Sequence, residues 1–301
     1  MRSTLLFFID GVGIGENNPS KNPFVKYGFK TFQEIFGAVP TLDNPALNSG
    51  SAYLFPVNAT LGVPGFPQSG TGQTTIFTGE NAAQLLGAHF GPYPHSHILP
   101  LLNEKNIFRF FQERKLESAF ANAYPQPFFD YLNSGKKRTS ASSTMCLASG
   151  IRLRTIMDLQ KGKALTAEID NSRWISKLNY DLPDISVQTA AERLLELTRE
   201  NQFTLYEYYL TDHFGHGRNL DYFEEAYKKL DEFLFHILSH IDGAETTFLL
   251  CSDHGNFEDM SIKTHTYNPA IAISAGKDSE LLCGKIKDLT HIKSAITALY
   301  P

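Results

Sequence analysis

The stretch TLLFFIDGVG at residues 4–13 points to the fold class of this chain. Its first part, Thr4–Ile9, is an almost entirely apolar run without polar alternation, which is typical of a strand buried on both faces. The run ends abruptly at Asp10 and Gly11, a pair that favours a turn. Strands buried on both faces occur in α/β proteins, where helices cover both sides of the sheet.

Outward from this strand, the chain continues as an alternation of predicted strands and helices. Apolar runs predict strands at 118–124, 203–210, 246–251 and 270–274, and helix-forming stretches lie at 74–86, 98–115, 187–200 and 221–241. The last helix has the clearest pattern, because Phe223, Tyr227, Leu230, Leu234 and Ile237 recur at steps of three and four. This alternation predicts an α/β fold with three layers, in which helices cover both faces of a mostly parallel sheet.

Composition and length narrow the kind of protein further. The chain has 301 residues, 42% of them hydrophobic and 20% charged, which is the balance of a globular protein. Its three cysteines are too few for a disulfide scaffold and suit a reducing compartment. The apolar start of the chain is too short for a signal peptide or a membrane span. With a net charge of −5, we expect a cytoplasmic protein that binds neither membranes nor nucleic acid.

Charge is distributed unevenly along the chain. Between residues 135 and 177, nine Lys and Arg stand against three Asp and Glu, a balance of +6 that leaves −11 for the remainder. Within this segment, KKRTSASST at 136–144 is polar, small and turn-prone. Such an asymmetry often accompanies a change of domain. We therefore predict one core, formed by 1–124 and 188–301, with a small basic cap inserted at 125–187.

Three predicted strands end at or next to an aspartate: Asp10, Asp212 and Asp253. In an open α/β sheet, ligands bind beyond the carboxyl ends of the strands. Three carboxylates gathered there would repel one another unless a cation neutralised them. Histidines accompany them at positions 213, 216, 254 and 265, and Asp with His suits zinc or manganese better than calcium. The number of ligands predicts two divalent ions, zinc or manganese.

A second element is SGTGQTT at 69–75, which places hydroxyl groups in a glycine-rich turn before a predicted helix. Backbone amides at a helix N-terminus favour phosphate, and a metal beside a hydroxyl favours its alkoxide. The stretch lacks the Gly-Lys-Ser/Thr ending of a nucleotide-binding P-loop. It is therefore compatible with a phosphate site of another kind.

The order of these motifs resembles that of the alkaline phosphatase superfamily. The matching blocks are FIDGVGIG at 8–15, Ser69 with Thr78-Gly79, Asp212-x-x-x-His216, DHGN at 253–256 and THTxNP at 264–269. They look most similar to the branch that contains cofactor-independent phosphoglycerate mutase and phosphopentomutase. The resemblance runs from residue 4 to about residue 272, with most of 90–200 unmatched, and implies an alkaline-phosphatase-like α/β/α core.

Carried over position by position, the resemblance implies two metal sites and a nucleophile. Asp10, Ser69, Asp253 and His254 would hold one ion, and Asp212, His216 and His265 would hold the other. Ser69 would accept the phosphoryl group, with Thr71 as the alternative because phosphopentomutases use a threonine. The resemblance assigns no residues that bind the rest of the substrate.

The sequence also departs from the family pattern. Phosphoglycerate mutases carry a much larger inserted domain that retains the phosphoglycerate intermediate, whereas the predicted cap has only about 60 residues. The Cys-x-Pro-x-Arg motif of sulfatases is absent. We therefore expect a metal-dependent phosphoester hydrolase that acts on a small phosphorylated metabolite through a phosphoserine. The alternatives are a phosphodiesterase or nucleotide pyrophosphatase, then a phosphomutase, and finally a non-catalytic metal-binding relative.

The other histidines have separate interpretations. His236 and His240 have metal-ligand spacing on a helix, but they flank its apolar stripe, so we expect them on an exposed face. His89, His95 and His97 follow the nucleophile helix and either line the pocket or belong to an ordinary loop.

Overall fold

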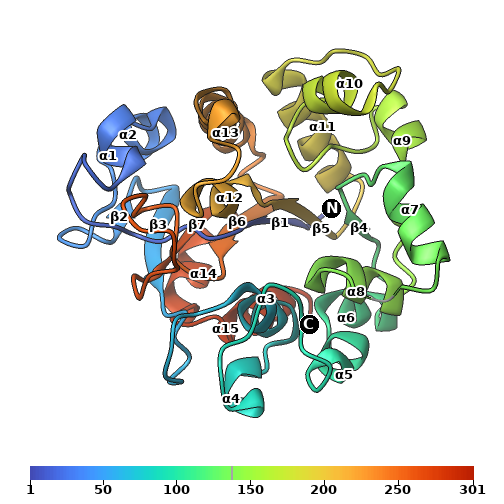
Figure 1. Cartoon of the computed structure of the whole chain (residues 1–301), viewed down its shortest axis with the longest axis horizontal. Helices are drawn as coiled ribbons and strands as arrows, with labels where there is room; N and C mark the ends of the chain where they lie inside the picture. Colours follow the sequence, from blue (N-terminus) through green and yellow to red (C-terminus); the bar gives the residue numbers. More distant parts are fainter. Residues whose placement is uncertain (137) are drawn as a thin grey trace.

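The computed structural model describes residues 1–136 and 138–301. A seven-stranded sheet in the order β2-β3-β7-β6-β1-β5-β4 runs through the molecule (Figure 1). Its strands are β1 (Ser3–Ile9), β2 (Leu47–Asn48), β3 (Ala52–Val57), β4 (Ser118–Phe120), β5 (Phe203–Tyr208), β6 (Thr246–Ser252) and β7 (Ala270–Gly276). The apolar run Thr4–Ile9 forms most of the central strand β1, and every residue of this strand is buried.

The sheet is mixed, with one parallel half and one antiparallel half. β6, β1, β5 and β4 run parallel to one another, whereas β7 is antiparallel to both β6 and β3, and β2 is antiparallel to β3. The prediction of a mostly parallel sheet therefore holds for the half around β1 only. The reason lies in residues 253–269, which join β6 to β7 without a helix, and neighbouring strands that lack a crossover helix pair antiparallel.

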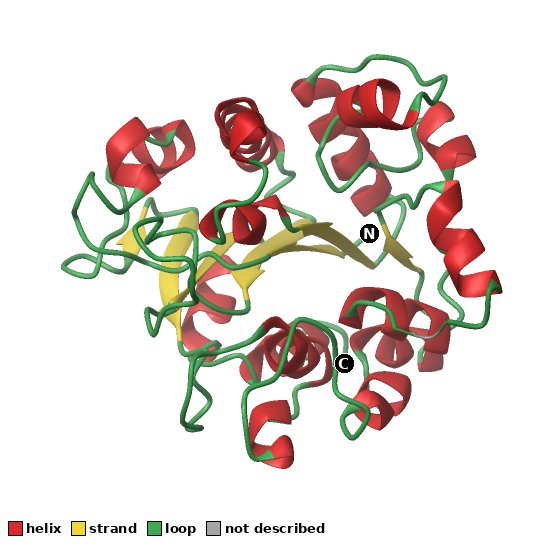
Figure 2. Ribbon diagram, in the orientation of Figure 1, coloured by secondary structure: helices red, strands yellow, loops and turns green. Residues whose placement is uncertain are grey.

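Helices cover both faces of this sheet, which confirms the three-layer α/β architecture (Figure 2). One face packs against α1 (Pro23–Tyr27), α2 (Lys30–Phe36), α11 (Val187–Arg199) and α13 (Phe223–His240). The other packs against α3 (Ser69–Thr78), α4 (Ala82–Leu86), α5 (Leu99–Glu104), α6 (Ile107–Glu113), α8 (Ala141–Ala148), α14 (Ser279–Lys285) and α15 (His291–Thr297). β1 serves both layers because its side chains alternate: Phe7 belongs to the first apolar cluster and Phe8 to the second.

Two predicted elements have different boundaries in the structure. The single helix predicted at 74–86 is two helices: α3 begins earlier, at Ser69, and ends at Thr78 before the left-handed Gly79, and α4 follows. The helix predicted at 98–115 is divided into α5 and α6, since the side chain of Asn106 accepts a hydrogen bond from the backbone of Arg109 and starts a new helix.

Residues 125–187 contain α7 (Gln126–Asn133), α8, α9 (Ile156–Gln160) and α10 (Ser172–Leu178). α8 contributes Met145 and Cys146 to the apolar cluster that also holds α3 and α5. By contrast, Leu159 and Trp174 belong to a small cluster of their own. Lys229 of α13 forms an ion pair of 2.7 Å with Asp170, which fixes the start of α10 against the core. The boundaries of a separate cap stay a prediction.

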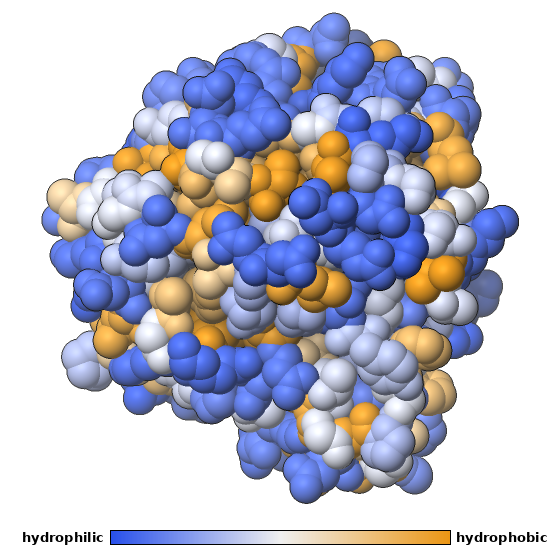
Figure 3. Space-filling model, turned by 90° about the vertical axis from the view of Figure 1, so that its left-hand side faces the viewer, coloured by the Kyte–Doolittle hydropathy of each residue, from blue (hydrophilic) through white to orange (hydrophobic). Residues whose placement is uncertain are grey.

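The surface near the β2 edge carries apolar side chains in a band across the middle of the face, broken by hydrophilic ones (Figure 3). Tyr27 of α1 is one of the aromatic residues that are exposed to solvent. Among the described residues, no helix is both long enough and apolar enough to cross a bilayer.

Candidate metal centre

The three predicted aspartates meet at the carboxyl end of the parallel strands. Asp10 directly follows β1, Asp253 directly follows β6, and Asp212 lies in α12 (Leu210–Gly215), the short helix that begins just after β5. Since β6, β1 and β5 are adjacent and parallel, their ends deliver these residues to one place. The structure thus brings together side chains that are more than 200 residues apart in the sequence.

One group of possible ligands is formed by Asp212, His216 and His265. The Nε2 atoms of the two histidines are 3.2 Å apart, and they lie 3.4 and 3.6 Å from Asp212 Oδ1. Each Nδ1 is hydrogen-bonded to a backbone carbonyl oxygen, that of Lys263 for His216 and that of Pro67 for His265. A carbonyl oxygen only accepts, so each Nδ1 carries a proton, and in the neutral ring the lone pair of Nε2 points toward Asp212. This arrangement is typical of histidines that bind a metal.

The second group surrounds His254. Its Nε2 lies 3.0 Å from Ser69 Oγ, 3.4 Å from Asp10 Oδ1 and 3.5 Å from Asp253 Oδ2. Burial lowers the pKa of His254, which keeps the ring neutral, as a metal ligand must be. Asp10 and His254 also come within ligand distance of Asp212, so this carboxylate lies between the two groups.

Among the described residues, no Lys or Arg forms an ion pair with the buried carboxylates of Asp10, Asp212 and Asp253. Burial raises the pKa of Asp10 well above its ordinary value, and the neighbouring Asp253 and Asp212 raise it further. Asp10 Oδ1 is buried and has no hydrogen-bond partner among the described residues. Gln73 donates only two long hydrogen bonds, of 3.4 Å to Asp10 and 3.3 Å to Asp253. The residues present fit a metal, because a divalent cation would supply the missing positive charge and Asp10 Oδ1 would be free to ligate it.

Ser69 and Thr71 differ clearly in their surroundings. Ser69 starts α3 and directs its hydroxyl at His254. The hydroxyl of Thr71 donates to the carbonyl of Gln68 at 3.1 Å and accepts from the backbone N–H of Phe90 at 3.2 Å. Gly72 packs closely against the site, because a Cβ there would lie 3.0 Å from Asp253. Ser69 therefore faces the acidic cluster, whereas the hydroxyl of Thr71 is used within its own loop.

Two residues that support the cluster were missed in the sequence analysis, Asn256 and Glu258. Asn256 donates a 2.7 Å hydrogen bond to Asp212 Oδ1. Glu258 is almost completely buried, and its Oε2 accepts hydrogen bonds of 2.8 Å from the backbone N–H groups of Gly13 and Asn256. Its Oε1 accepts from Thr266 and from the side-chain amide of Asn268. Glu258 thereby joins the loop after β1, the loop after β6 and the segment that carries His265.

The remaining histidines take no part in these groups. His213 lines the cavity beside Asp212, and its Nδ1 accepts a 3.1 Å hydrogen bond from Asn219. His236 and His240 stack on each other on α13 with ring centroids 4.0 Å apart. His89 is bound to the backbone oxygens of Thr60 and Val63, and the loop after α4 contributes Pro92 and Tyr93 to the cavity instead.

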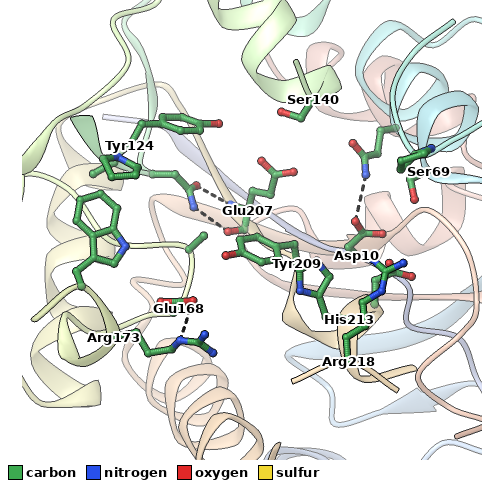
Figure 4. A pocket seen from close by; sticks show the side chains of 18 of the residues that line it. Asp10, Ser69, Tyr124, Ser140, Glu168, Arg173, Glu207, Tyr209, His213 and Arg218 are labelled. Carbon is green, nitrogen blue, oxygen red and sulfur yellow. Dashed lines mark hydrogen bonds and ion pairs between the residues drawn. The ribbon is translucent and has the colours of Figure 1, made fainter. Parts of the chain in front are cut away.

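A cavity of about 570 Å³ opens beside Ser69, Asp10 and Asp212 (Figure 4). It extends from this cluster toward the ends of β4 and β5 and toward α10. A chamber of this size next to buried ligand-type side chains is typical of the site where an enzyme binds a small molecule.

Comparison with known proteins identifies the class to which this fold and site belong. The model of the metalloenzyme superfamily matches residues 2–297, so the chain belongs to that superfamily. The fold is shared with the PH0037 protein from Pyrococcus horikoshii, at a TM-score of 0.57 and 14% identity over 99% of this chain and 96% of the other. It is also shared with a protein in the alkaline phosphatase superfamily from Vibrio parahaemolyticus, at a TM-score of 0.50 and 11% identity over 99% of this chain and 66% of the other.

Among curated proteins, the chain is similar to 2,3-bisphosphoglycerate-independent phosphoglycerate mutases. That of Ehrlichia canis is 29% identical over 126 residues, which is 38% of this chain and 25% of the mutase. That of Methanococcus vannielii is 29% identical over 96 residues, 32% of this chain and 23% of the mutase. The similarity therefore covers about a quarter of the length of these relatives. The predicted resemblance is thereby confirmed for the fold, which is shared with a protein of the alkaline phosphatase superfamily, and for the sequence, part of which is similar to phosphoglycerate mutases.

Proposed function

We propose that this protein is a metal-dependent phosphoester hydrolase that cleaves phosphate monoesters of a small metabolite through a phosphoserine at Ser69. The observation that carries the proposal is the position of Ser69 Oγ, 3.0 Å from His254 Nε2 and next to an acidic cluster with an unpaired carboxylate oxygen. A hydroxyl group placed among metal ligands can act as a nucleophile, because a bound cation favours the ionised form of the hydroxyl.

The proposed metal sites follow the two groups of side chains. Asp10, Ser69, Asp253 and His254 would hold one divalent ion, and Asp212, His216 and His265 would hold the other, zinc or manganese in each case. When bound, the ions would supply positive charge that lowers the pKa of the Ser69 hydroxyl and stabilises the phosphoryl oxygens. Asn256 and Glu258 would keep the ligands in register by their hydrogen bonds.

Ser69 Oγ would lose its proton to solvent and form a bond to phosphorus while the bond between phosphorus and the alcohol oxygen breaks, and the alcohol would leave after its oxygen takes up a proton from solvent. The backbone N–H groups of Ser69 and Gly70 donate no hydrogen bond within the described residues, and they lie at the positive end of the ten-residue helix α3. They are therefore available to phosphoryl oxygens. Water would then hydrolyse the phosphoserine, which releases phosphate and restores the hydroxyl.

A phosphomutase is the second candidate, because the curated relatives are phosphoglycerate mutases. A mutase must hold its substrate while the phosphoryl group moves, and we favour hydrolysis because the segment between β4 and α11 is short. The two activities are separated by their products: hydrolysis releases free phosphate, whereas a mutase returns an isomeric phosphoester. A phosphodiesterase would be recognised by faster cleavage of a diester than of the corresponding monoester.

The test is a comparison of Ser69→Ala with Thr71→Val in metal-loaded protein, measured as phosphate release from a panel of phosphorylated metabolites. We expect Ser69→Ala to lose at least about 10³-fold in kcat while it retains most of its metal. Thr71→Val should keep substantial activity, because the Thr71 hydroxyl serves its own loop. Full activity in Ser69→Ala, or loss confined to Thr71→Val, would overturn the assignment of the nucleophile.

A further inference from the structure

The cavity beside Ser69 is much larger than a phosphoryl group needs. Its volume of about 570 Å³ lies within the range of pockets that bury a drug-sized ligand. The part beyond the acidic cluster is lined by residues of β5, α10 and the segments before α7 and α8 (Figure 4). If the proposed function is right, this part faces the alcohol portion of the phosphoester.

Glu207 is the unusual member of this lining. Phe203 and Leu205 of β5 pack into the apolar cluster with α3 and α8, and Glu207 is the next residue on the same face. A carboxylate therefore stands where the strand alternation calls for another apolar side chain. It is turned into the cavity (Figure 4).

The position of Glu207 is fixed by three hydrogen bonds. The side chain of Asn122 accepts from the Glu207 N–H and donates to the Glu207 carbonyl, both at 2.8 Å. Ser142 of α8 donates to Glu207 Oε2 at 2.6 Å. The other oxygen, Oε1, accepts no hydrogen bond from the residues that the structure describes, and no Lys or Arg among them forms an ion pair with it. The Glu207 side chain is thus fixed in position through Oε2, and its Oε1 can accept a hydrogen bond from a ligand in the cavity.

Aromatic side chains line the same cavity. Trp174 of α10 is buried in the small apolar cluster that also holds Leu159 of α9. Tyr124 is held by a 2.7 Å hydrogen bond between its hydroxyl and Ser143, and its ring stacks on Phe128. Flat apolar surfaces next to a free carboxylate match an alcohol that has both a C–H face and hydroxyl groups, because the ring faces pack and the hydroxyls donate.

We propose that Glu207 determines specificity by accepting a hydrogen bond from a hydroxyl group on the alcohol part of the substrate, a hydroxylated ring that packs against Trp174 and Tyr124. The inference rests on the proposed function for the identity of the phosphate ester. The hydroxylated ring is either that of a free sugar phosphate or the ribose of a nucleotide, and the probes below distinguish the two.

The first experiment measures binding without chemistry. Trp174 is the only tryptophan in the chain, so its fluorescence reports on the occupancy of this cavity. The metal-loaded Ser69→Ala protein is titrated with glucose 6-phosphate and with cyclohexylmethyl phosphate, which has the ring without hydroxyls. A second pair is AMP and 2′,3′-dideoxy-AMP. We expect the hydroxylated member of one pair to bind at least about tenfold more tightly than its partner.

The Glu207 variants then decide the role of the carboxylate. In Glu207→Met and Glu207→Leu, which both lack an acceptor, the preference for the hydroxylated probe should fall to about twofold or less. Glu200→Gln, which changes an exposed carboxylate paired with Lys163, should leave the preference unchanged. Circular dichroism confirms that each variant is folded, and the comparison uses whichever of the two Glu207 variants folds. An unchanged preference in a folded Glu207 variant, or no preference in either pair, would overturn the inference. Failure of the proposed function shows itself separately, as absence of phosphate release from every ester by the unmutated, metal-loaded protein.

Discussion

Replacing Glu258 with glutamine should weaken metal binding without touching a proposed ligand. Glu258 is 1% exposed and receives four hydrogen bonds, from the backbone of Gly13 and Asn256 and from the side chains of Thr266 and Asn268. Hydrogen bonds to a charged group contribute about 1.5–3 kcal/mol each. The glutamine oxygen can keep the two backbone donors, but its NH₂ group then faces two side chains that both donate at present.

The size of the stability loss depends on whether the side chains of Thr266 and Asn268 can form new hydrogen bonds with the glutamine. The Thr266 hydroxyl can rotate and accept from the new NH₂ group, whereas the Asn268 amide must turn or lose its bond. With the loss of charge and of one hydrogen bond, we expect the free energy of unfolding to fall by about 2–4 kcal/mol. Because Glu258 holds the segments that carry Asp10, His254 and His265, metal affinity should fall about 10–100-fold, as for other residues that orient metal ligands.

The assay is a chelator competition for zinc and manganese together with thermal unfolding in the absence of metal. Glu280→Gln is the matched control, since Glu280 is exposed on α14 and takes part in none of the hydrogen bonds that hold the site. Metal affinity and thermal stability equal to those of the unmutated protein in Glu258→Gln would refute the reasoning, and so would an equal loss in the control.

Two further predictions concern charge at the cavity. Lys177 and Arg218 line the exposed rim of the cavity, so Lys177→Glu combined with Arg218→Glu should lower kcat/KM for an anionic phosphoester, and the loss should be larger at 20 mM than at 500 mM salt. The control Lys285→Glu, on α14, should leave kcat/KM unchanged. A loss in the double variant that does not depend on salt would contradict this prediction. Burial raises the pKa of Glu207 to about 7, from an ordinary value of 4.5, so the folded state binds this proton more tightly than the unfolded chain and loses stability as the pH rises from about 4.5 to 7. Glu207→Gln removes this titration. In denaturant titrations without metal, the free energy of unfolding of the variant relative to the unmutated protein should therefore be about 1–3 kcal/mol more favourable at pH 8 than at pH 5. An equal difference at the two pH values would show that Glu207 does not titrate in this range.

The sequence predicts the fold best where burial alone decides it. The uninterrupted apolar run at residues 4–9 is typical of a strand buried on both faces, and it forms β1, on whose alternating side chains the two apolar clusters meet. The antiparallel half was not predicted, because the direction of β7 depends on the loop at 253–269. That loop is shaped by the hydrogen bonds that Glu258 receives, and these come from residues distant in the chain as well as near ones.

At the site, the sequence predicts where the acidic residues gather better than it predicts the residues that hold them in place. Asp10, Asp212 and Asp253 follow buried strands, so the topology of a parallel sheet is enough to bring them together. The sequence around Glu207 and Glu258 gives no comparable signal, because the role of each carboxylate depends on hydrogen bonds with residues distant in the chain, such as Ser142 for Glu207 and Gly13 for Glu258. Thr71 and Ser69 likewise differ only in what lies opposite each hydroxyl.

The net charge of residues 135–177 is a weaker guide to substrate attraction than its sum of +6 suggests. Arg152 pairs with Asp158 at 2.7 Å, Lys163 pairs with Glu200, and Arg173 pairs with Glu168 at 3.3 Å. These charges hold the segment together, and pairing cancels their field at a distance. Lys177 forms no ion pair with the described residues and lines the cavity mouth, so the attraction of an anion depends on individual unpaired side chains there. The double charge reversal at Lys177 and Arg218 therefore tests the part of the segment's charge that the substrate can reach.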